Sequence, residues 1–231
     1  MNDNNSLINC YTQLTSAVQD YYKCLDDCAC CFNCKSAEEA WIKCYKAFGK
    51  NSNRNDEDLA KVLDHYLRAW GMYRNSFINN RPEVHLPAIR IIRNGNYWNL
   101  KEINCSGVID KKDKIKRLIS EILKVYAEQR YQVRQETINS TVSAILVSKV
   151  LLGTLGCVPA YDSNFSKGLE VFGIRPKSFG INSVVAVAEA FKPYESALES
   201  FDVNRYVIGS PEVSYPCMKI IDCGLWYLGK G

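Results

Sequence analysis

Gly153–Ile174 has the sequence GTLGCVPAYDSNFSKGLEVFGI and joins two segments of helical character. Glycines and Pro159 interrupt the apolar run, and a new amphipathic pattern begins directly after Asp162. Aspartate is a preferred helix N-cap, because its carboxylate accepts hydrogen bonds from the free N–H groups of the first turn. The stretch therefore predicts two helices joined by a tight turn, with one carboxylate at the junction.

The rest of the chain also favours helices. Apolar residues recur at helical spacing, Ser36 and Glu39 form a capping box, and Asn55 or Asp56 and Asp110 or Asp113 can cap later helices. We expect helices at about 36–48, 56–70, 85–93, 113–126, 141–152, 163–172 and 182–201, and from 216 onward. Pro193 should kink or divide the helix over 182–201.

These patterns predict an all-α protein with two helical lobes around a cleft. Arg205–Gly209 is the best candidate for a strand. The chain would form one helical domain over 1–231, with possible lobes at 1–108, which is rich in cysteine, and 109–231, which carries Asp162.

Composition and charge narrow the class of protein. The chain has 231 residues, 47% hydrophobic and 23% charged, which is ordinary for a folded protein. The N-terminus shows no signal-peptide pattern, and polar residues and glycines interrupt the longest apolar stretch, Val142–Val158. We therefore expect a cytoplasmic protein without a membrane partner.

Basic residues are concentrated over 111–134, although the net charge is only +4. Lys111, Lys112 and Lys114 begin this stretch and could contact DNA phosphates. A solvated helix face is the alternative interpretation.

Five cysteines crowd into CLDDCACCFNC, residues 24–34, of eleven in the chain. Cys24, Cys28, Cys31 and Cys34 are the candidates for metal ligands, but their spacing matches no standard zinc or iron–sulfur pattern. Reduced thiols are the other interpretation. The sequence contains no nucleotide-binding or zincin motif, and we expect no cofactor.

A carboxylate at a helix N-terminus can do more than cap the helix. The positive end of the helix dipole favours the ionised form of Asp162, and such an anion can stabilise an oxocarbenium-like sugar or orient a water molecule. Capping alone is the simpler interpretation. Tyr161 adjoins Asp162 and could contact the same ligand.

A second candidate cluster lies in RAWGMYRNSF, residues 68–77. Trp70 and Tyr73 share one helix face with Phe77, and Arg74 lies beside them. Aromatic rings beside an arginine are suited to stacking on an extruded base near a phosphate. The same spacing is also typical of a core stripe.

The segment 140–174 resembles the part of helix-hairpin-helix DNA glycosylases that carries the catalytic aspartate. The matching features are Asp162 at a helix start, Asn164 two residues later, and the apolar-Gly-apolar step Phe172–Ile174. The resemblance implies a DNA N-glycosylase with Asp162 as the catalytic residue.

Two features of the sequence differ from that family, and they bear on whether the activity would be monofunctional or bifunctional. The hairpin glycines are missing before Asp162, and Ser143 and Ala144 occupy the region where bifunctional members carry a lysine nucleophile. The resemblance therefore implies a monofunctional enzyme that uses water, with Lys149 as the nearest amine and a possible phosphate contact. The alternative is a non-catalytic helical module that binds nucleic acid or protein.

The whole chain also resembles a bacterial family with WGMYR and GTLGCVPAYD as landmarks. That resemblance implies a bacterial, cytoplasmic protein. Phage DNA is a source of modified bases, so a role in phage defence is one hypothesis for a glycosylase of this kind.

Overall fold

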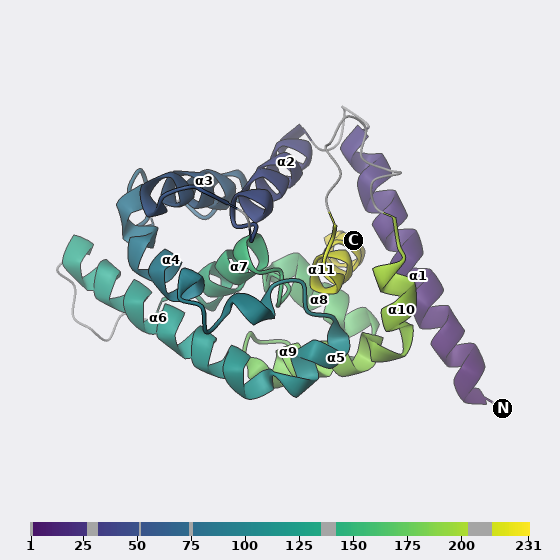
Figure 1. Cartoon of the computed structure of the whole chain (residues 1–231). Helices are drawn as coiled ribbons and strands as arrows, with labels where there is room; N and C mark the ends of the chain where they lie inside the picture. The colour runs from purple at the N-terminus through teal and green to yellow at the C-terminus, as the bar shows by residue number, and fades with distance from the viewer. Residues whose placement is uncertain (1, 27–31, 51, 74–75, 135–141, 203–213) are drawn as a thin grey trace.

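The structure is a computed structural model that describes residues 2–26, 32–50, 52–73, 76–134, 142–202 and 214–231. These residues form helices, 3-10 turns and loops, and they contain no strand (Figure 1). The all-α prediction is confirmed. The candidate strand Arg205–Gly209 lies outside the described residues.

All regular elements of the described residues are helices or 3-10 turns. The helices and 3-10 turns (η) are α1 (Asn2–Asp26), α2 (Phe32–Ala47), α3 (Asp56–Ala69), η1 (Pro82–His85), α4 (Leu86–Arg93), η2 (Trp98–Leu100), α5 (Cys105–Asp110), α6 (Lys112–Arg134), α7 (Ala144–Thr154), α8 (Ser163–Val171), α9 (Ile181–Phe191), η3 (Lys192–Tyr194), α10 (Glu195–Glu199) and α11 (Cys217–Lys230). Among the helices of the described residues, none combines the length and apolar character needed to cross a bilayer.

Local signals determine several helix ends. The side chain of Asn55 accepts a hydrogen bond from the backbone of Asp58 and caps α3, as the sequence predicted. Pro193 lies in the 3-10 turn that separates α9 from α10, so the expected break occurs. The predicted capping box at Ser36 is wrong as a helix start, because α2 begins at Phe32.

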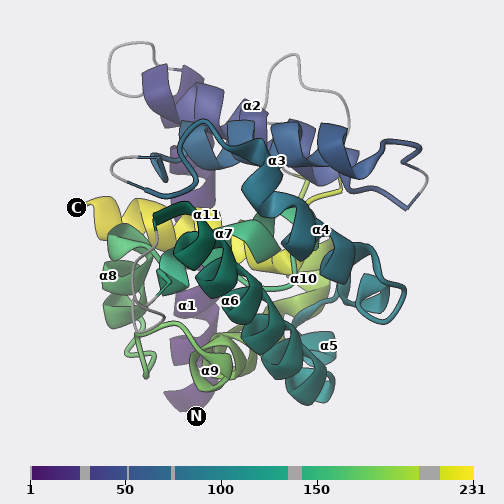
Figure 2. The same ribbon diagram turned by 90° about the vertical axis from the view of Figure 1, so that its left-hand side faces the viewer.

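The apolar helix α7 lies at the centre of the molecule together with α11 (Figures 1 and 2). Every residue of α7 from Leu146 to Thr154 is buried. α2 and α3 pack against α7, whereas α8 and α1 pack against α11. A helix that is apolar on all sides needs such complete cover, which explains its central position.

The described residues share one hydrophobic core. Buried side chains from both halves of the chain contribute to it, and α1 of the first half packs directly on α11 of the second. The proposed lobe boundary at residue 108 falls inside α5, Cys105–Asp110. The packing therefore does not separate lobes 1–108 and 109–231.

Two glycines allow the backbones of α8 and α11 to touch. A Cβ atom on Gly168 would overlap the carbonyl group of Leu225, and one on Gly229 would overlap that of Asn164. Because backbone atoms move less easily than a flexible side chain, this contact fixes how α8 lies on α11.

We expect Gly168→Ala to lower the free energy of unfolding by about 1–3 kcal/mol, since overpacking outweighs the helix propensity of alanine. Thermal unfolding should show a loss of about 2–4 °C per kcal/mol. Gly95→Ala is the control, because no atom lies within 4 Å of an added Cβ there. A melting temperature for Gly168→Ala at or above that of the wild type would contradict this packing.

Candidate functional site

Asp162 is the N-cap of α8. Its Oδ1 accepts a hydrogen bond from the backbone N–H of Phe165 over 3.1 Å, and its Oδ2 lies 3.5 Å from Nζ of Lys149. The Asp162 side chain keeps 18% of its surface exposed, whereas that of Lys149 keeps 5%. The carboxylate thus lies at the edge of the core with a buried cation behind it.

Lys149 is a charged residue in the apolar helix α7. Besides its ion pair with Asp162, its Nζ donates to the carbonyl oxygen of Trp70 over 3.3 Å and lies 5.3 Å from the centre of the Trp70 ring. Burying an ammonium group is costly unless partners surround it. In the Lys149–Asp162 ion pair, the charge of each group offsets part of the desolvation cost of burying the other.

The loop before Asp162 is tied to two helices. The N–H of Tyr161 donates to Oγ of Ser148 on α7 over 3.0 Å. The N–H of Ala160 donates to Oδ1 of Asp222 on α11 over 2.8 Å. These bonds hold the backbone on both sides of the turn, so the position of the Asp162 carboxylate is defined by the core.

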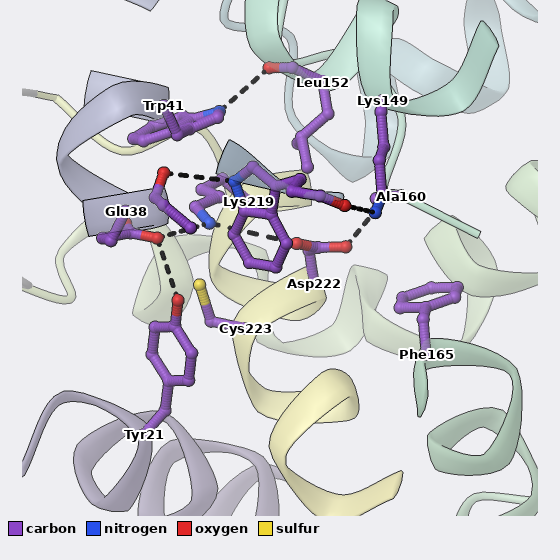
Figure 3. Close-up of polar contacts among 12 residues, drawn as sticks. Tyr21, Glu38, Trp41, Lys149, Leu152, Ala160, Phe165, Lys219, Asp222 and Cys223 are labelled. Carbon is purple, nitrogen blue, oxygen red and sulfur yellow. Dashed lines mark hydrogen bonds and ion pairs between the residues drawn. The ribbon is translucent and has the colours of Figure 1, made fainter. Parts of the chain in front are cut away.

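A buried charge cluster of Glu38, Lys219 and Asp222 lies next to this loop (Figure 3). Nζ of Lys219 is 2.8 Å from Oε2 of Glu38 and 4.0 Å from Oδ2 of Asp222. Three tyrosine hydroxyl groups donate to the Glu38 carboxylate: Tyr21, Tyr22 and Tyr215. Each charge in the cluster has a partner, as burial requires.

Trp70 connects the buried charge cluster to the Lys149–Asp162 pair. The centre of its ring lies 5.3 Å from Nζ of Lys149 and 5.4 Å from Nζ of Lys219. Cations near the ring are attracted by its quadrupole. One aromatic side chain therefore borders both charged groups.

The Asp222 carboxyl group has a strongly altered acidity. Burial raises its pKa, the Lys219 ammonium opposes this and Asp162 adds to it, so that the pKa reaches about 7. Lys149 contributes a smaller lowering. The pKa of Asp222 thus depends on the charges of Lys149 and Asp162 as well as on the charge of Lys219.

The three predicted base-binding aromatics have different environments. Tyr161 is buried, its hydroxyl accepts from Ser183 over 2.9 Å, and its ring packs on Phe165. Trp70 is half-buried, and its Nε1 donates to a main-chain carbonyl. Tyr73 is 38% exposed. Tyr161 is therefore part of the core that holds the Asp162 loop, and Tyr73 is the most exposed of the three.

The residues predicted to contact phosphate also lie in different environments. Lys112 is exposed on α6, Lys111 donates to the carbonyl oxygen of Asn99, and Nζ of Lys114 lies 6.0 Å from the Tyr97 ring centre. Lys149 is buried, and its Nζ pairs with the Asp162 carboxylate. Arg74 lies outside the described residues.

The cysteine-rich segment falls mostly outside the described part of the chain. Cys24 is half-buried; Cys28, Cys31 and the side chain of Cys34 are not described. Among the described side chains, no group of three or more histidine, cysteine or acidic residues is arranged to hold a metal.

A pocket of about 250 Å³ lies between α6, the start of α7 and the segment after α3. Gly71, which follows Trp70, and Leu146, three residues before Lys149, line it together with Arg130 and Arg134 of α6. We call it the arginine pocket. Lys149 and Asp162 are not part of its lining.

No family model matches the chain, and neither a curated protein nor a solved structure is similar enough to match. The chemistry of the site therefore has to be inferred from its geometry and from the residues themselves.

Sequence reasoning missed Glu38, Lys219 and Asp222. The signal that could have found two of them is their placement: Lys219 and Asp222 are three residues apart in a helix whose other residues from Cys217 to Leu225 are apolar or glycine. Charges at i and i+3 on a buried helix indicate an internal pair. Glu38 carries no such signal.

Asp222→Asn should change how stability depends on pH. The pKa of Asp222 is higher in the folded protein, about 7, than in the unfolded chain, about 3.9. The folded state binds the extra proton between these values, so this contribution to stability is complete below pH 4 and is lost as the pH rises through 7. Asparagine can still accept from Ala160 but does not ionise.

Denaturant unfolding at pH 4.5–8 would measure this difference. Relative to the wild type, Asp222→Asn should gain at most about 1.4 kcal/mol per pH unit up to pH 7. A constant difference between the two proteins across that range would contradict the raised pKa.

Proposed function

We propose that the protein is a monofunctional DNA N-glycosylase that removes a damaged or modified base, with Asp162 as its catalytic residue. The observation that carries the proposal is the Lys149–Asp162 pair, in which the carboxylate is the more exposed member. The resemblance of residues 140–174 to glycosylases supports the same class.

The chemistry requires an anion beside the sugar. Breaking the bond between C1′ and the base nitrogen creates an oxocarbenium-like sugar, which a fixed carboxylate stabilises. A water molecule then supplies its hydroxyl group to C1′, and its proton ends on the departing base. Asp162 can stabilise the sugar and orient this water, while Lys149 and the N–H of Phe165 keep the carboxylate in place.

The arginine pocket suits the substrate of such an enzyme. Arg130 and Arg134 can hold backbone phosphates beside an extruded nucleotide, because phosphate contacts position DNA in an enzyme of this kind. Tyr73, exposed two residues after Gly71 of the pocket, offers a ring for stacking.

A non-catalytic nucleic-acid-binding module is the second candidate. One observation favours it: Asp162 already has a structural role, as the N-cap of α8. The two candidates differ in turnover, so an activity assay separates them.

Asp162→Asn should reduce base release by at least about 100-fold while leaving DNA binding nearly intact. Asparagine is also a good N-cap, so the substitution removes the charge and keeps the cap; losses of this size are typical when a fixed electrostatic group is removed. Abasic-site formation on duplexes with varied modified bases measures the activity. Asp113→Asn, at an acidic residue in the first turn of α6, is the matched control.

Three outcomes would contradict the proposal. Equal activity of Asp162→Asn and wild type would exclude Asp162 from the reaction. DNA binding without base release on any duplex would favour the second candidate. A covalent adduct trapped with borohydride, and lost in Lys149→Met, would show an amine nucleophile in place of water.

Replacing both arginines of the pocket with glutamine should weaken duplex binding and flatten its salt dependence. Each lost phosphate contact lowers the slope of log K against log salt by about 0.9, so Arg130→Gln/Arg134→Gln should lower it by about 1.8. Lys167→Gln/Lys192→Gln, at two exposed lysines elsewhere, controls for net charge. An unchanged slope would remove the arginine pocket from the DNA-binding surface.

A further inference from the structure

Four cations gather where α2 ends and the chain turns toward α3. Lys43 and Lys46 lie one turn apart on α2, and Lys50 and Arg54 follow in the loop. All four are exposed and line one open pocket of about 960 Å³. Within the part of the chain that the structure describes, none of them has an ion-pair partner. Unpaired like charges around a hollow make a surface for an anionic ligand.

The acidic residues nearby do not neutralise these four cations. The first turn of α3 holds three acidic residues, and two of them pair with cations outside the set. Asp58 lies 3.5 Å from Lys61, and Asp56 lies 2.6 Å from Arg93. Asp58 also lines the pocket, so four cations and one carboxylate form its wall and its net charge is positive.

A second, smaller pocket of about 220 Å³ adjoins the first. The two share Ala47, Gly49, Lys50 and Ser52 in their walls. The smaller pocket is also lined by the ring of the half-buried Trp98 and by the buried side chain of Phe48. A cationic pocket thus continues into one with an aromatic wall.

The amine of Lys101 lies near Trp98. Its Nζ is 6.0 Å from the centre of the Trp98 ring and donates to the main-chain carbonyl groups of Tyr45 and Thr154. A cation at this distance is weakly attracted by the ring quadrupole. Trp98 remains half-buried, so part of its side chain is open to a ligand.

We infer that this double pocket, the corner site of Lys43, Lys46, Lys50, Arg54 and Trp98, binds single-stranded nucleic acid. Cations that track the backbone beside an aromatic ring that stacks on a base are the combination by which proteins hold single strands. An unpaired base can reach a half-buried ring at the end of a cationic pocket, whereas a base inside a duplex stays stacked on its neighbours. The corner site uses none of the residues proposed for base release, so it is tested separately.

Binding of the full-length protein to fluorescein-labelled dT20, followed by polarisation at several salt concentrations, tests the inference. Lys46→Gln/Lys50→Gln should lower the slope of log K against log salt by about 1.4, at about 0.7 per single-strand contact. Trp98→Leu should weaken binding by roughly 5- to 150-fold, the range found when a stacking ring is removed. Lys167→Gln/Lys192→Gln should leave both slope and affinity close to those of the wild type.

A second aromatic variant separates stacking from folding. Trp98→Phe keeps a ring and should retain most of the affinity, and melting temperatures of all variants should show that each is folded. Asp162→Asn should bind dT20 as the wild type does, so loss of base release and loss of strand binding are distinguishable.

Other results would overturn the inference. These are an equal loss of affinity for dT20 and for a duplex of the same length after Lys46→Gln/Lys50→Gln, absence of salt-dependent binding to dT20, or an unchanged affinity for dT20 after Trp98→Leu. Full competition by dTMP at the concentration of dT20 nucleotides would show a site for a free nucleotide and not for a strand.

Discussion

The buried ammonium group of Lys219 determines how three helices of the fold pack together. A fully buried cation is tolerated only where carboxylates surround it, and here Glu38 from α2 and Asp222 from its own helix do so. Tyrosines from α1 and from the segment before α11 complete the bonds of Glu38. Satisfying one charge therefore brings α1, α2 and α11 together around the central helix.

The same constraint positions the candidate active site. Asp222 reaches from the charge cluster to the backbone of Ala160, and Trp70 lies against both Lys219 and Lys149. The Asp162 carboxylate is consequently held from behind by the core, with a partly exposed side toward solvent. Charges inside the molecule fix this geometry, whereas the cations of the corner site, Lys43, Lys46, Lys50 and Arg54, are exposed at the surface.

Local features of the fold could be predicted because their physical cause is local. Asn55 and Asp162 cap helices through bonds to backbone groups three residues away, and the ring of Pro193 interrupts a helix wherever it falls. The helix over 2–26 was not predicted, since its polar sequence gains its order mainly by packing on α11. The burial of Tyr161 could not be predicted for a related reason: its position beside Asp162 does not reveal that its ring packs on Phe165.

The helical character of the chain, the approximate extent of most helices and the carboxylate at the start of α8 are all encoded locally in the sequence. The contacts of that carboxylate depend on how the helices pack. Lys149 is 13 residues before Asp162 and Lys219 is 181 residues after Glu38, and no local pattern encodes contacts across such separations. The physical reason is that capping and helix periodicity act within a few residues, whereas the pairing of buried charges is decided when the helices pack.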